Sequence, residues 1–397
     1  MPRFEPFCGL RYLHERVHMD QVIAPPYDVV ESAERVRLAT RSPFNSILLE
    51  LPEPDLVGGI DRYQVAAALL GRWRDQGVLV RDARPAFYPY TMTSPDGRSS
   101  TGVIGALGLV EPDRPGADVL PHEQTLPKPA SDRLDLLSAT RANLSPIWGL
   151  SLTSGLSALI EPTGRPAADA TDDDGVRHQL WVVDDPALVD PITTAVAESP
   201  VVIADGHHRY ATALAYRRQR AEAQLAAPGD DAVMALVVEL VADQLTVGPI
   251  HRTVAGLPEG TDLVKVFAEW FDVVRAGPAT DRVVGALGTS ASLALLTGGG
   301  AWLLTPKEEA AEEADSDLDA SLVDLALSAV PHTTAHRHTW QEAAAAVADG
   351  EAQAAVLLRP VTVDQIAEWA AAGRRMPPKT TYFSPKPRTG MVFRSLG

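Results

Sequence analysis

The sequence predicts a mixed α/β, or α+β, fold, and three observations support this class. Several stretches place apolar residues three and four positions apart, which is typical of amphipathic helices. Other stretches are short runs of apolar and β-branched residues, which are typical of strands. The turn Ser94-Pro95-Asp96-Gly97 joins two such strands directly, as in a β-hairpin. Strands and helices therefore interleave along the chain, with hairpins among them.

The elements follow one another with recognisable beginnings and ends. A helix is expected over residues 61–76, because its apolar positions have helical spacing and Gly77 is placed to end it. The hairpin occupies residues 86–109, and a strand over 200–204 leads through a Gly turn into a helix over about 207–224. The other expected elements are strands over 233–240, 245–250 and 292–296, and helices over 261–271, 317–329, 340–348 and 362–372.

Two acid-rich stretches are predicted to be solvated loops or linkers. Residues 161–175 contain three consecutive aspartates at 172–174, and residues 307–319 contain seven acids. Runs of like charge repel one another and favour water, so they rarely build a core. We therefore place both stretches on the surface.

Charge and composition exclude several classes of function. The 397 residues include 35 Lys and Arg against 52 Asp and Glu, a net charge of −17, so we expect no nucleic-acid or membrane partner. Cys8 is the only cysteine, which excludes a disulfide framework and fits a reducing, cytoplasmic compartment. No apolar run resembles a signal peptide or membrane span. We expect a globular protein that is not exported.

The most informative segment joins the strand over 200–204 to the following helix through Asp205, Gly206, His207, His208 and Arg209. The first N–H groups of a helix and its positive dipole end attract anions. The dipole contributes only about 0.3–1 kcal/mol, whereas a charge-assisted bond from a guanidinium contributes about 1.5–3 kcal/mol. Arg209 is therefore expected to do most of the anion binding. The alternative is a helix cap at Asp205 with two exposed histidines.

This Asp-Gly-His-His-Arg string resembles the phosphate-binding signature of the ParB/sulfiredoxin superfamily, which includes free serine kinases that phosphorylate L-serine with ADP or ATP. Nearly the whole chain also resembles the bacterial and archaeal DUF1015 family. The segments that carry this second resemblance are 24–29, 44–45, 122–125, 131–134, 143–147, 205–210, 249–252 and 376–386. Two positions depart from the family pattern: Gly248-Pro249-Ile250-His251 replaces the usual Pro-Thr-His, and Ser384 stands where an aromatic residue is common.

The resemblance implies an organisation in three segments. Residues 1–110 would form an N-terminal α/β segment, and residues 111–255 a ParB/sulfiredoxin-like phosphate-binding core. Residues 256–397 would form a C-terminal α/β segment that returns a Lys-rich loop to the site. Some relatives are understood to be serine kinases that use pyrophosphate as donor, so the resemblance also implies phosphoryl transfer.

Phosphoryl transfer needs cations to stabilise the transferred oxygens and a base for the attacking hydroxyl. Glu123, preceded by His122, is the first candidate for this base and Asp205 the second. Arg133 is a candidate for binding phosphate or substrate. The alternative is that Glu123 forms a surface ion pair with Arg133 or Lys128. His207 and His208 complete the catalytic candidates, and Gly206 lies in the phosphate turn with Arg209.

Two further segments supply candidate binding residues. His251 and Arg252 follow the strand-like run 245–250, and their alternative is a solvated strand end. The Pro-flanked segment near the C-terminus is stiff, because proline fixes its own φ, and lysine binds phosphate well; the alternative is a structural plug. Its candidates are Lys379, Thr380, Thr381, Tyr382 and Lys386.

The N-terminal turn Pro25-Pro26-Tyr27-Asp28 could aim Tyr27 and Asp28 into a site, although a turn with a capping aspartate is an equal alternative. Asn45 is a further binding candidate from the family segments. Asp28 or Glu50 could bind Mg²⁺ or the amino group of serine. Mg²⁺ is the cofactor we expect, and no metal ligands are assigned.

A histidine-rich stretch, residues 331–338, has the spacing of some zinc ligands but lacks a cysteine or a clear fourth ligand. An exposed strand or loop is the default interpretation there.

The sequence as a whole favours a small-molecule phosphotransferase that phosphorylates free L-serine with pyrophosphate or a nucleotide. Two alternatives stay open: a ParB-like nucleotide-binding switch or adaptor, and a phosphatase that uses the same pocket. The expected partners are serine and a phosphate donor.

Overall fold

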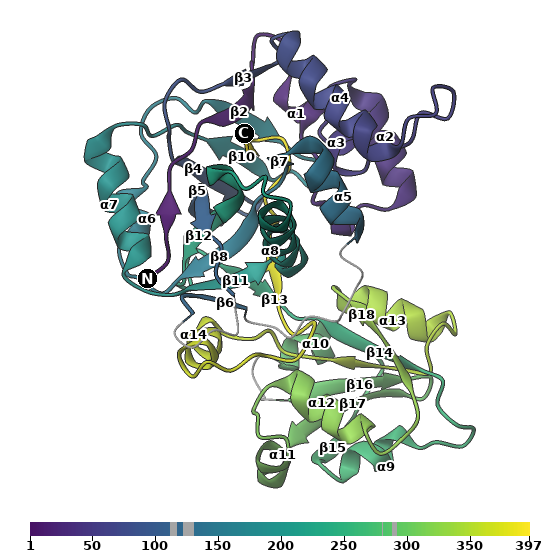
Figure 1. Cartoon of the computed structure of the whole chain (residues 1–397). Helices are drawn as coiled ribbons and strands as arrows, with labels where there is room; N and C mark the ends of the chain where they lie inside the picture. Colours follow the sequence, from purple (N-terminus) through teal and green to yellow (C-terminus); the bar gives the residue numbers. More distant parts are fainter. Residues whose placement is uncertain (112–116, 122–130, 280, 288–291) are drawn as a thin grey trace. The chain divides into compact units, whose positions relative to one another are not determined.

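The computed structural model describes residues 1–111, 117–121, 131–279, 281–287 and 292–397 (Figure 1). These residues form two compact units. The first contains Met1–Thr246, Ala370–Gly373 and Pro385–Gly397, and the second contains Val247–Trp369 and Arg374–Ser384. The chain thus leaves the first unit at Thr246 and returns to it near its C-terminus. The three-segment organisation expected from the resemblance stays a prediction.

The first unit is a mixed α/β structure built mainly on one large sheet and one small sheet. Its strands are β1 (Phe4–Glu5), β2 (Gly9–Tyr12), β3 (Leu79–Arg81), β4 (Tyr88–Thr93), β5 (Ser99–Gly108), β6 (Val119–Pro121), β7 (Ala142–Asn143), β8 (Ile147–Ser151), β9 (Ala168–Thr171), β10 (Arg177–Leu180), β11 (Val201–Asp205), β12 (Ala232–Glu239) and β21 (Phe393–Ser395). Its helices are α1 (Met19–Val22), η1 (Tyr27–Val29), α2 (Ser32–Arg41), α3 (Ile47–Glu50), α4 (Arg62–Asp75), α5 (Ser131–Thr140), α6 (Leu156–Leu159), α7 (Pro186–Ala197), α8 (His207–Glu222) and η2 (Pro228–Asp231).

The large sheet positions the strand that leads into the candidate site. Its strand order, within the described residues, is β6-β11-β8-β12-β5-β4-β10-β9, with β1 beside β5. Strand β11 pairs antiparallel with β8 and parallel with β6, so it lies near one edge. Its buried residues pack with Tyr210, Ala213 and Leu214 of α8 in the main core of the unit. This packing fixes the start of α8 at the end of β11.

Several elements predicted from the sequence are confirmed. The helix expected over 61–76 is α4, whose N-cap Asp61 accepts hydrogen bonds from the backbone N–H groups of Tyr63 and Gln64. The expected hairpin is the antiparallel pair β4 and β5, which share a six-residue register. The strand and helix around Asp205 are β11 and α8. The local sequence pattern was sufficient to predict these elements, because the capping residues and the apolar positions can both be identified in the sequence.

The small sheet of the first unit has the order β3-β2-β21-β7 in the described residues, so a C-terminal strand pairs with an N-terminal one. Arg394 of β21 is buried and donates to Asn143 Oδ1 at 3.1 Å and to the carbonyl oxygens of Ala232 and Gly229 at 2.9 and 3.0 Å. Burial lowers the pKa of Arg394 to about 10. The returning segment is therefore part of the core of this unit.

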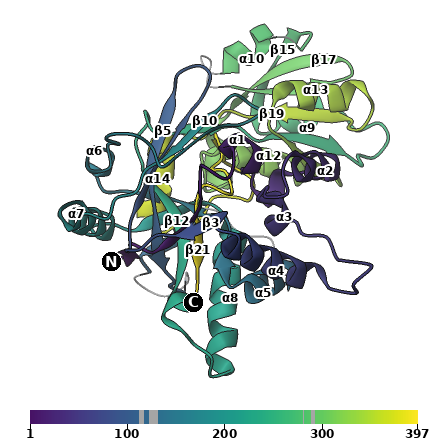
Figure 2. The ribbon, with the colours of Figure 1, turned by 90° about the horizontal axis from the view of Figure 1, so that it is seen from above.

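Helices α4, α5 and α8 lie side by side on the first unit in both views (Figures 1 and 2). Leu137 of α5 and Tyr216 of α8 share a small buried cluster with Leu396. The candidate site lies along this helical side, because α5 and α8 both contribute residues to it.

The second unit is a sheet covered by helices on both faces. Its strands are β13 (Thr246–Gly248, starting at the junction), β14 (His251–Ala255), β15 (Phe271–Gly277), β16 (Leu293–Thr297), β17 (Gly300–Pro306), β18 (Thr333–Arg337), β19 (Ala354–Leu357) and β20 (Tyr382–Ser384). Its helices are α9 (Leu263–Ala268), α10 (Asp281–Leu287), α11 (Glu308–Glu313), α12 (Asp319–Leu327), α13 (Trp340–Ala348) and α14 (Val363–Ala371, whose end belongs to the first unit).

The larger sheet of the second unit has the order β15-β17-β16-β19-β14-β18 in the described residues, and β13 pairs with β20. Alternate residues of β16 enter two different cores. Leu293 and Leu295 pack with α9 and α12, whereas Ala294 and Leu296 pack with α10 and α13. Side chains of a strand alternate between faces, so this division places the two helix pairs on opposite faces.

Some predicted elements were wrong. Residues 307–319 are not a loop, since Glu and Ala are strong helix formers and buried Ala310 anchors α11 to the core. Residues 161–175 include β9, which pairs with β10. The helix expected over 261–271 ends early, because Phe271 begins β15. The strand expected over 245–250 is only β13, so His251 begins β14 instead of following the end of a longer run.

The sequence had suggested that all three aspartates of residues 172–174 are solvated, but one of them is not. The Asp172 side chain is only 6% exposed and accepts hydrogen bonds from Arg388 Nε at 2.8 Å and from the ring of His178 at 2.9 Å. Its carboxylate is used to hold the returning C-terminal segment. By contrast, the histidine-rich stretch 331–338 contains β18, an exposed edge strand, as expected by default.

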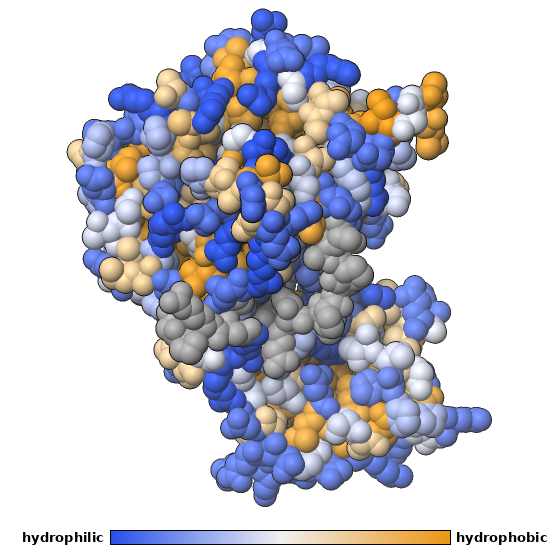
Figure 3. Space-filling model, viewed as in Figure 1, coloured by the Kyte–Doolittle hydropathy of each residue, from blue (hydrophilic) through white to orange (hydrophobic). Residues whose placement is uncertain are grey.

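The face in Figure 3 is mostly hydrophilic, with apolar residues in small groups. None of the described helices is long and apolar enough to cross a membrane.

Candidate functional site

The site begins at the turn between β11 and α8. Gly206 is the N-cap of α8 and has a φ of +90°, in the left-handed region where residues with a Cβ are strained. A Cβ built on Gly206 would lie 3.0 Å from Ile147 Cγ2 and 3.2 Å from Arg209 Cζ. Glycine is therefore needed here for two reasons, backbone conformation and close packing. The turn holds Asp205 and Arg209 at a fixed separation.

Asp205 is held between two cations. Its Oδ1 accepts from Lys386 Nζ at 2.8 Å, and its Oδ2 accepts from Arg209 Nη2 at 2.9 Å. The Lys386 and Arg209 side chains are only 12% and 11% exposed, so water screens these pairs weakly. Among these three side chains one positive charge is in excess, and Asp28 and Glu50 are further anions that act on Arg209. The cluster therefore attracts an anion to the start of α8.

The protonation states follow from this arrangement. Burial alone raises the pKa of Asp205, but the charges of Lys386 and Arg209 outweigh burial and bring the pKa below its usual value. Burial likewise lowers the pKa of Arg209, whereas Asp205, Asp28 and Glu50 among its anionic neighbours raise it overall. At neutral pH the Asp205 carboxylate and the Arg209 guanidinium are therefore both charged. Because both oxygens of Asp205 accept from cations, this carboxylate is a weak base.

Arg209 is also fixed from its other side. Its Nη1 donates to Ser145 Oγ at 3.3 Å and to the carbonyl oxygen of Pro146. Both partners lie just before β8, the neighbour of β11 in the sheet. The guanidinium is thus held by the sheet and by its own helix, which places its charge with little freedom to move.

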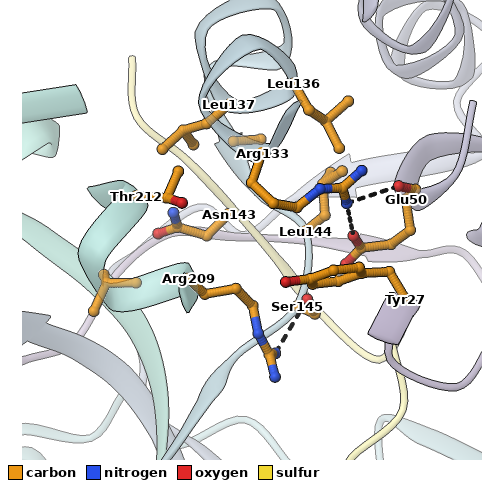
Figure 4. Close-up of a pocket in the computed structure, with 12 residues that line it drawn as sticks. Tyr27, Glu50, Arg133, Leu136, Leu137, Asn143, Leu144, Ser145, Arg209 and Thr212 are labelled. Carbon is orange, nitrogen blue, oxygen red and sulfur yellow. Dashed lines mark hydrogen bonds and ion pairs between the residues drawn. The ribbon is translucent and has the colours of Figure 1, made fainter. Parts of the chain in front are cut away.

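A cavity of about 60 Å³ lies behind Arg209 (Figure 4). Elements η1, α3, α5, β7 and α8 of the first unit supply its wall. Its lining residues are Tyr27, Glu50, Arg133, Leu136, Leu137, Ala142, Asn143, Leu144, Ser145, Arg209, Thr212 and Val233.

Arg133 and Glu50 form one charged side of this cavity. Arg133 Nη1 donates to the carbonyl oxygen of Glu50 at 2.9 Å and to Glu50 Oε2 at 3.3 Å. The Arg133 guanidinium carbon lies 4.3 Å from the centre of the Tyr27 ring, which is a cation–π contact. Burial raises the pKa of Tyr27, and the neighbouring arginines only partly offset this. Tyr27 is therefore a neutral phenol that can donate a hydrogen bond.

The structure brings several sequence-predicted residues together in the first unit, namely Tyr27, Arg133, Asp205, Gly206, Arg209 and Lys386. His207 is partly exposed and His208 is exposed, both in the first turn of α8. Asp28 is exposed beside Tyr27 and contributes to the electrostatic field at Arg209.

Asn45 has a structural environment away from this cavity. It is fully buried, its Nδ2 donates to the carbonyl oxygens of Gln21 and Ile23, and its Oδ1 accepts from the N–H of Ile47. These contacts hold the turn before α3. They position Glu50 at the end of that helix.

The remaining described candidates lie in the second unit. His251 is buried, and its Nδ1 accepts from the N–H of Leu358 at 3.2 Å. Arg252 is buried and donates to the carbonyl oxygens of Lys379 and Pro378 at 2.8 and 3.2 Å. Neither residue is a solvated strand end, which was the sequence alternative.

The loop that Arg252 holds carries the other candidates of the second unit. Thr380 Oγ1 donates to the carbonyl oxygen of Pro377 at 2.7 Å, and Thr381 is buried beside it. The Tyr382 ring packs on His338 with centroids 4.2 Å apart. Lys379 has a φ of +59°, in the left-handed region. These contacts give the loop a defined conformation.

His122 and Glu123 lie outside the described residues, so their predicted roles stay predictions. Sequence reasoning missed the contributions of Ser145, Thr212 and Asn143 to the site. Asn143 and Ser145 lie in segment 143–147, one of the segments that carry the family resemblance, and Thr212 follows Arg209 by three residues and shares its helix face.

No group of three or more His, Cys, Asp or Glu side chains is arranged to hold a metal ion in the described part of the chain. Glu50 and Asp205 are paired with cations, whereas Asp28 forms no ion pair with any described residue. Mg²⁺ usually binds through one or two carboxylates, several waters and the phosphates of the substrate. Asp28 fits that mode, and the described residues offer no complete protein cage.

Comparisons with known proteins give one family and several distant structures. Residues 4–325 match the family described as "Protein of unknown function (DUF1015)". The comparison with curated proteins found no match.

Among solved structures, a conserved hypothetical protein from Pyrococcus furiosus has a TM-score of 0.38 at 15% identity, covering 70% of this chain and 92% of that chain. A free serine kinase in complex with AMP has a TM-score of 0.36 at 15% identity, covering 67% and 83%. SbnI with a C-terminal truncation, from Staphylococcus aureus, has a TM-score of 0.37 at 13% identity, covering 68% and 81%. The three likenesses are distant, and no residue role is transferred from them.

Proposed function

The chain belongs to the DUF1015 family, and from its candidate site we propose that it is a small-molecule phosphotransferase with an alcohol acceptor. The preferred reaction is phosphorylation of free L-serine by pyrophosphate or a nucleotide, which gives O-phosphoserine. The observation that carries this proposal is the pairing of a cationic helix start, at Asp205 and Arg209, with a small cavity directly behind Arg209.

The donor phosphates are assigned to the start of α8. Its first backbone N–H groups, the Arg209 guanidinium and the Lys386 ammonium together offer donors and positive charge to phosphate oxygens. The transition state of phosphoryl transfer spreads negative charge over these oxygens. Cations held in place beforehand stabilise that charge without having to reorganise.

The acceptor alcohol is assigned to the cavity. Its hydroxyl oxygen would attack the terminal phosphorus, a new P–O bond would form, and the bond to the leaving phosphate would break. The hydroxyl proton must pass to a carboxylate. Glu123 remains the first candidate for this base. Asp205 is the weaker one because it accepts from two cations, and Glu50 is a third candidate because it lines the cavity.

Mg²⁺ is part of the proposal as the partner of the donor phosphates, and Asp28 is the residue that would hold it from the protein side. When bound, the ion would neutralise phosphate charge. Arg209 and Lys386 would orient the phosphates through their own hydrogen bonds.

The test is incubation of the full chain with L-serine, Mg²⁺ and each of pyrophosphate, ADP and ATP, with phosphoserine measured by mass spectrometry. We expect product with at least one donor. The variant Arg209→Met should lower the rate at least about 100-fold, because a fixed cation at the transferred group is lost. Absence of product from every donor at micromolar enzyme would overturn the proposal.

Arg218→Met is the matched control for Arg209→Met. Arg218 lies on the same helix and also pairs with a carboxylate, Glu111, but its side chain is 59% exposed and does not line the cavity. Its rate should stay within about twofold of the wild-type rate, because exposed pairs contribute little. Equal losses in both variants would indicate a general effect of removing charge from α8.

A further inference from the structure

The side of the cavity formed by Thr212 and Asn143 is called its floor here. It contains a buried hydroxyl without a hydrogen-bond partner among the described residues. Thr212 lies one helical turn after Arg209 and is 4% exposed, and its Oγ1 has no hydrogen-bond partner among the described residues. A threonine in a helix often donates to the carbonyl oxygen of the preceding turn, but this one does not. Its side chain instead projects into the cavity (Figure 4). Buried polar atoms nearly always have partners, so this one indicates a group that occupies the cavity.

A second polar group of the floor is oriented by its own contacts. Asn143 is 7% exposed, and its Oδ1 accepts from the N–H of Met234 at 3.0 Å and from Arg394 Nη1 at 3.1 Å. These two bonds fix which end of the amide is oxygen. The Nδ2 end therefore offers its N–H groups to the cavity, and it donates to no acceptor in the part of the chain that the structure describes.

The composition of the wall defines the chemistry of the occupant. The floor offers the Asn143 amide N–H groups and the Thr212 hydroxyl, and Arg209 and the Tyr27 phenol add further donors. Glu50 is the only carboxylate among the lining residues that the structure describes. A ligand that fits this wall brings acceptor oxygens to the floor and a hydroxyl or ammonium group toward Glu50. An anionic head with a short donor-bearing chain meets both conditions.

The size of the cavity limits the occupant further. A water-sized group needs about 10–15 Å³ of such volume, so a cavity of about 60 Å³ holds about four to six non-hydrogen atoms, which is most of the seven in L-serine. The side chains of Leu136, Leu137 and Leu144 close the space between the polar groups. This space fits the carboxylate end of a short hydroxy or amino acid.

We propose that this cavity is the acceptor subsite and that Thr212 and Asn143 bind the carboxylate of a small hydroxy or amino acid, which presents its hydroxyl toward Arg209. This inference rests on the proposed function, since it names the class of acceptor. It makes Thr212 a specificity-determining residue. A phosphoryl acceptor that lacks a carboxylate would leave the Asn143 amide N–H groups without a hydrogen-bond acceptor.

The decisive variant is Thr212→Val, which replaces the hydroxyl by a methyl group of similar size. Removing a buried hydroxyl that has no partner should leave the melting temperature unchanged or raise it. A hydrogen bond to a charged group corresponds to about 10- to 100-fold in affinity. We therefore expect the dissociation constant of L-serine, measured by calorimetry without a phosphoryl donor, to rise by that factor. Thr212→Ser keeps the hydroxyl and should restore binding.

Ethanolamine, which lacks the carboxylate of serine, is the matched ligand. Wild-type protein should bind L-serine at least about 10-fold more tightly than ethanolamine, and Thr212→Val should lose most of this preference. Equal affinity of the wild type for both ligands, no binding of L-serine, or unchanged serine affinity in Thr212→Val would overturn the subsite. The last result is expected if the cavity holds only water.

Failure of the two proposals can be told apart. If the preference for serine depends on Thr212 but no donor yields phosphoserine, the proposed phosphotransferase activity is overturned and the proposed acceptor subsite stands. If phosphoserine forms with the same KM for serine in wild type and in Thr212→Val, the proposed acceptor subsite is overturned and the proposed phosphotransferase activity stands. The KM of the phosphoryl donor should be equal in both proteins, because Thr212 lies in the cavity and not at the start of α8.

Discussion

Replacing Lys386 by methionine should weaken the first unit measurably. The substitution removes the 2.8 Å bond from Lys386 Nζ to Asp205 and leaves Arg209 as the remaining side-chain partner of that carboxylate among the described residues. A charge-assisted hydrogen bond contributes about 1.5–3 kcal/mol, and each kcal/mol corresponds to about 2–4 °C for a unit of this size. We therefore expect the melting temperature to fall by about 3–12 °C, measured by circular dichroism. Methionine keeps much of the apolar stem, so the charge is the main loss.

Arg84→Met is the matched control for this prediction. Arg84 pairs with Asp184 at the same distance, 2.8 Å, but its side chain is 71% exposed instead of 12%. The exposed pair should contribute less than about 0.5 kcal/mol. If Lys386→Met and Arg84→Met melt at the same temperature, the argument that burial strengthens the Asp205 cluster is refuted.

The same variant should respond differently to acid and to pyrophosphate. The folded-state pKa of Asp205 lies below the ordinary carboxyl value, so its stabilising effect is present above about pH 4 and is lost as the pH falls through the lower folded value. Without Lys386 that folded pKa rises, and acid unfolding should begin at a higher pH. Pyrophosphate should raise the melting temperature of the wild type more than that of Lys386→Met, because an anion stabilises the form that binds it.

Three further predictions follow from other buried contacts. Burial lowers the pKa of His251 to about 4, so its neutral form stabilises the fold above pH 6.5, and this effect is lost as the pH falls toward 4. The total is about 3 kcal/mol, and His251→Asn should flatten that part of a stability–pH curve measured by urea titration. Gly206→Ala should lower the melting temperature more than Gly155→Ala, since both glycines have a φ of +90° but only Gly206 has close neighbours. Equal effects would contradict the packing argument. Arg388→Met leaves the buried Asp172 carboxylate with His178 as its remaining side-chain partner and should cost about 3–5 kcal/mol in chemical denaturation; a cost below 1 kcal/mol would contradict this.

The sequence was sufficient for elements whose boundaries are encoded locally. Helix α4 has a capping aspartate and a terminating glycine, and the hairpin β4–β5 has an Asp-Gly turn. The charge density of the acid-rich stretch that contains α11 predicted a loop, but the helix propensity of its Glu and Ala residues outweighs charge repulsion. Local pattern also could not show that Pro249 would separate β13 from β14.

The candidate site was only partly predictable for a different reason. The strand, turn and helix around Asp205 are contiguous, so their geometry follows from one segment. The pairing of Asp205 with Lys386 spans 181 residues. Asn143 reaches the cavity on β7, which pairs with β21, and Ser145 lies in the bend between β7 and β8. Such contacts depend on how strands are ordered in a sheet, which residue spacing does not encode. Lysine chemistry predicts a phosphate ligand, whereas the observed partner of Lys386 is the carboxylate of Asp205.

The position of Lys386 in the chain constrains how the site forms. Asp205 and Arg209 are synthesised before the second unit, whereas Lys386 belongs to the segment that returns to the first unit after it. Closing so long a loop costs entropy that grows only slowly with length. That segment also brings Arg388 to Asp172 and Arg394 to the backbone of Gly229 and Ala232. Since these buried contacts lie on the same segment as Lys386, docking of the segment and completion of the cationic cluster should be one cooperative step. The anion site is therefore a property of the completed first unit, and the β11–α8 segment alone lacks one of its two cations.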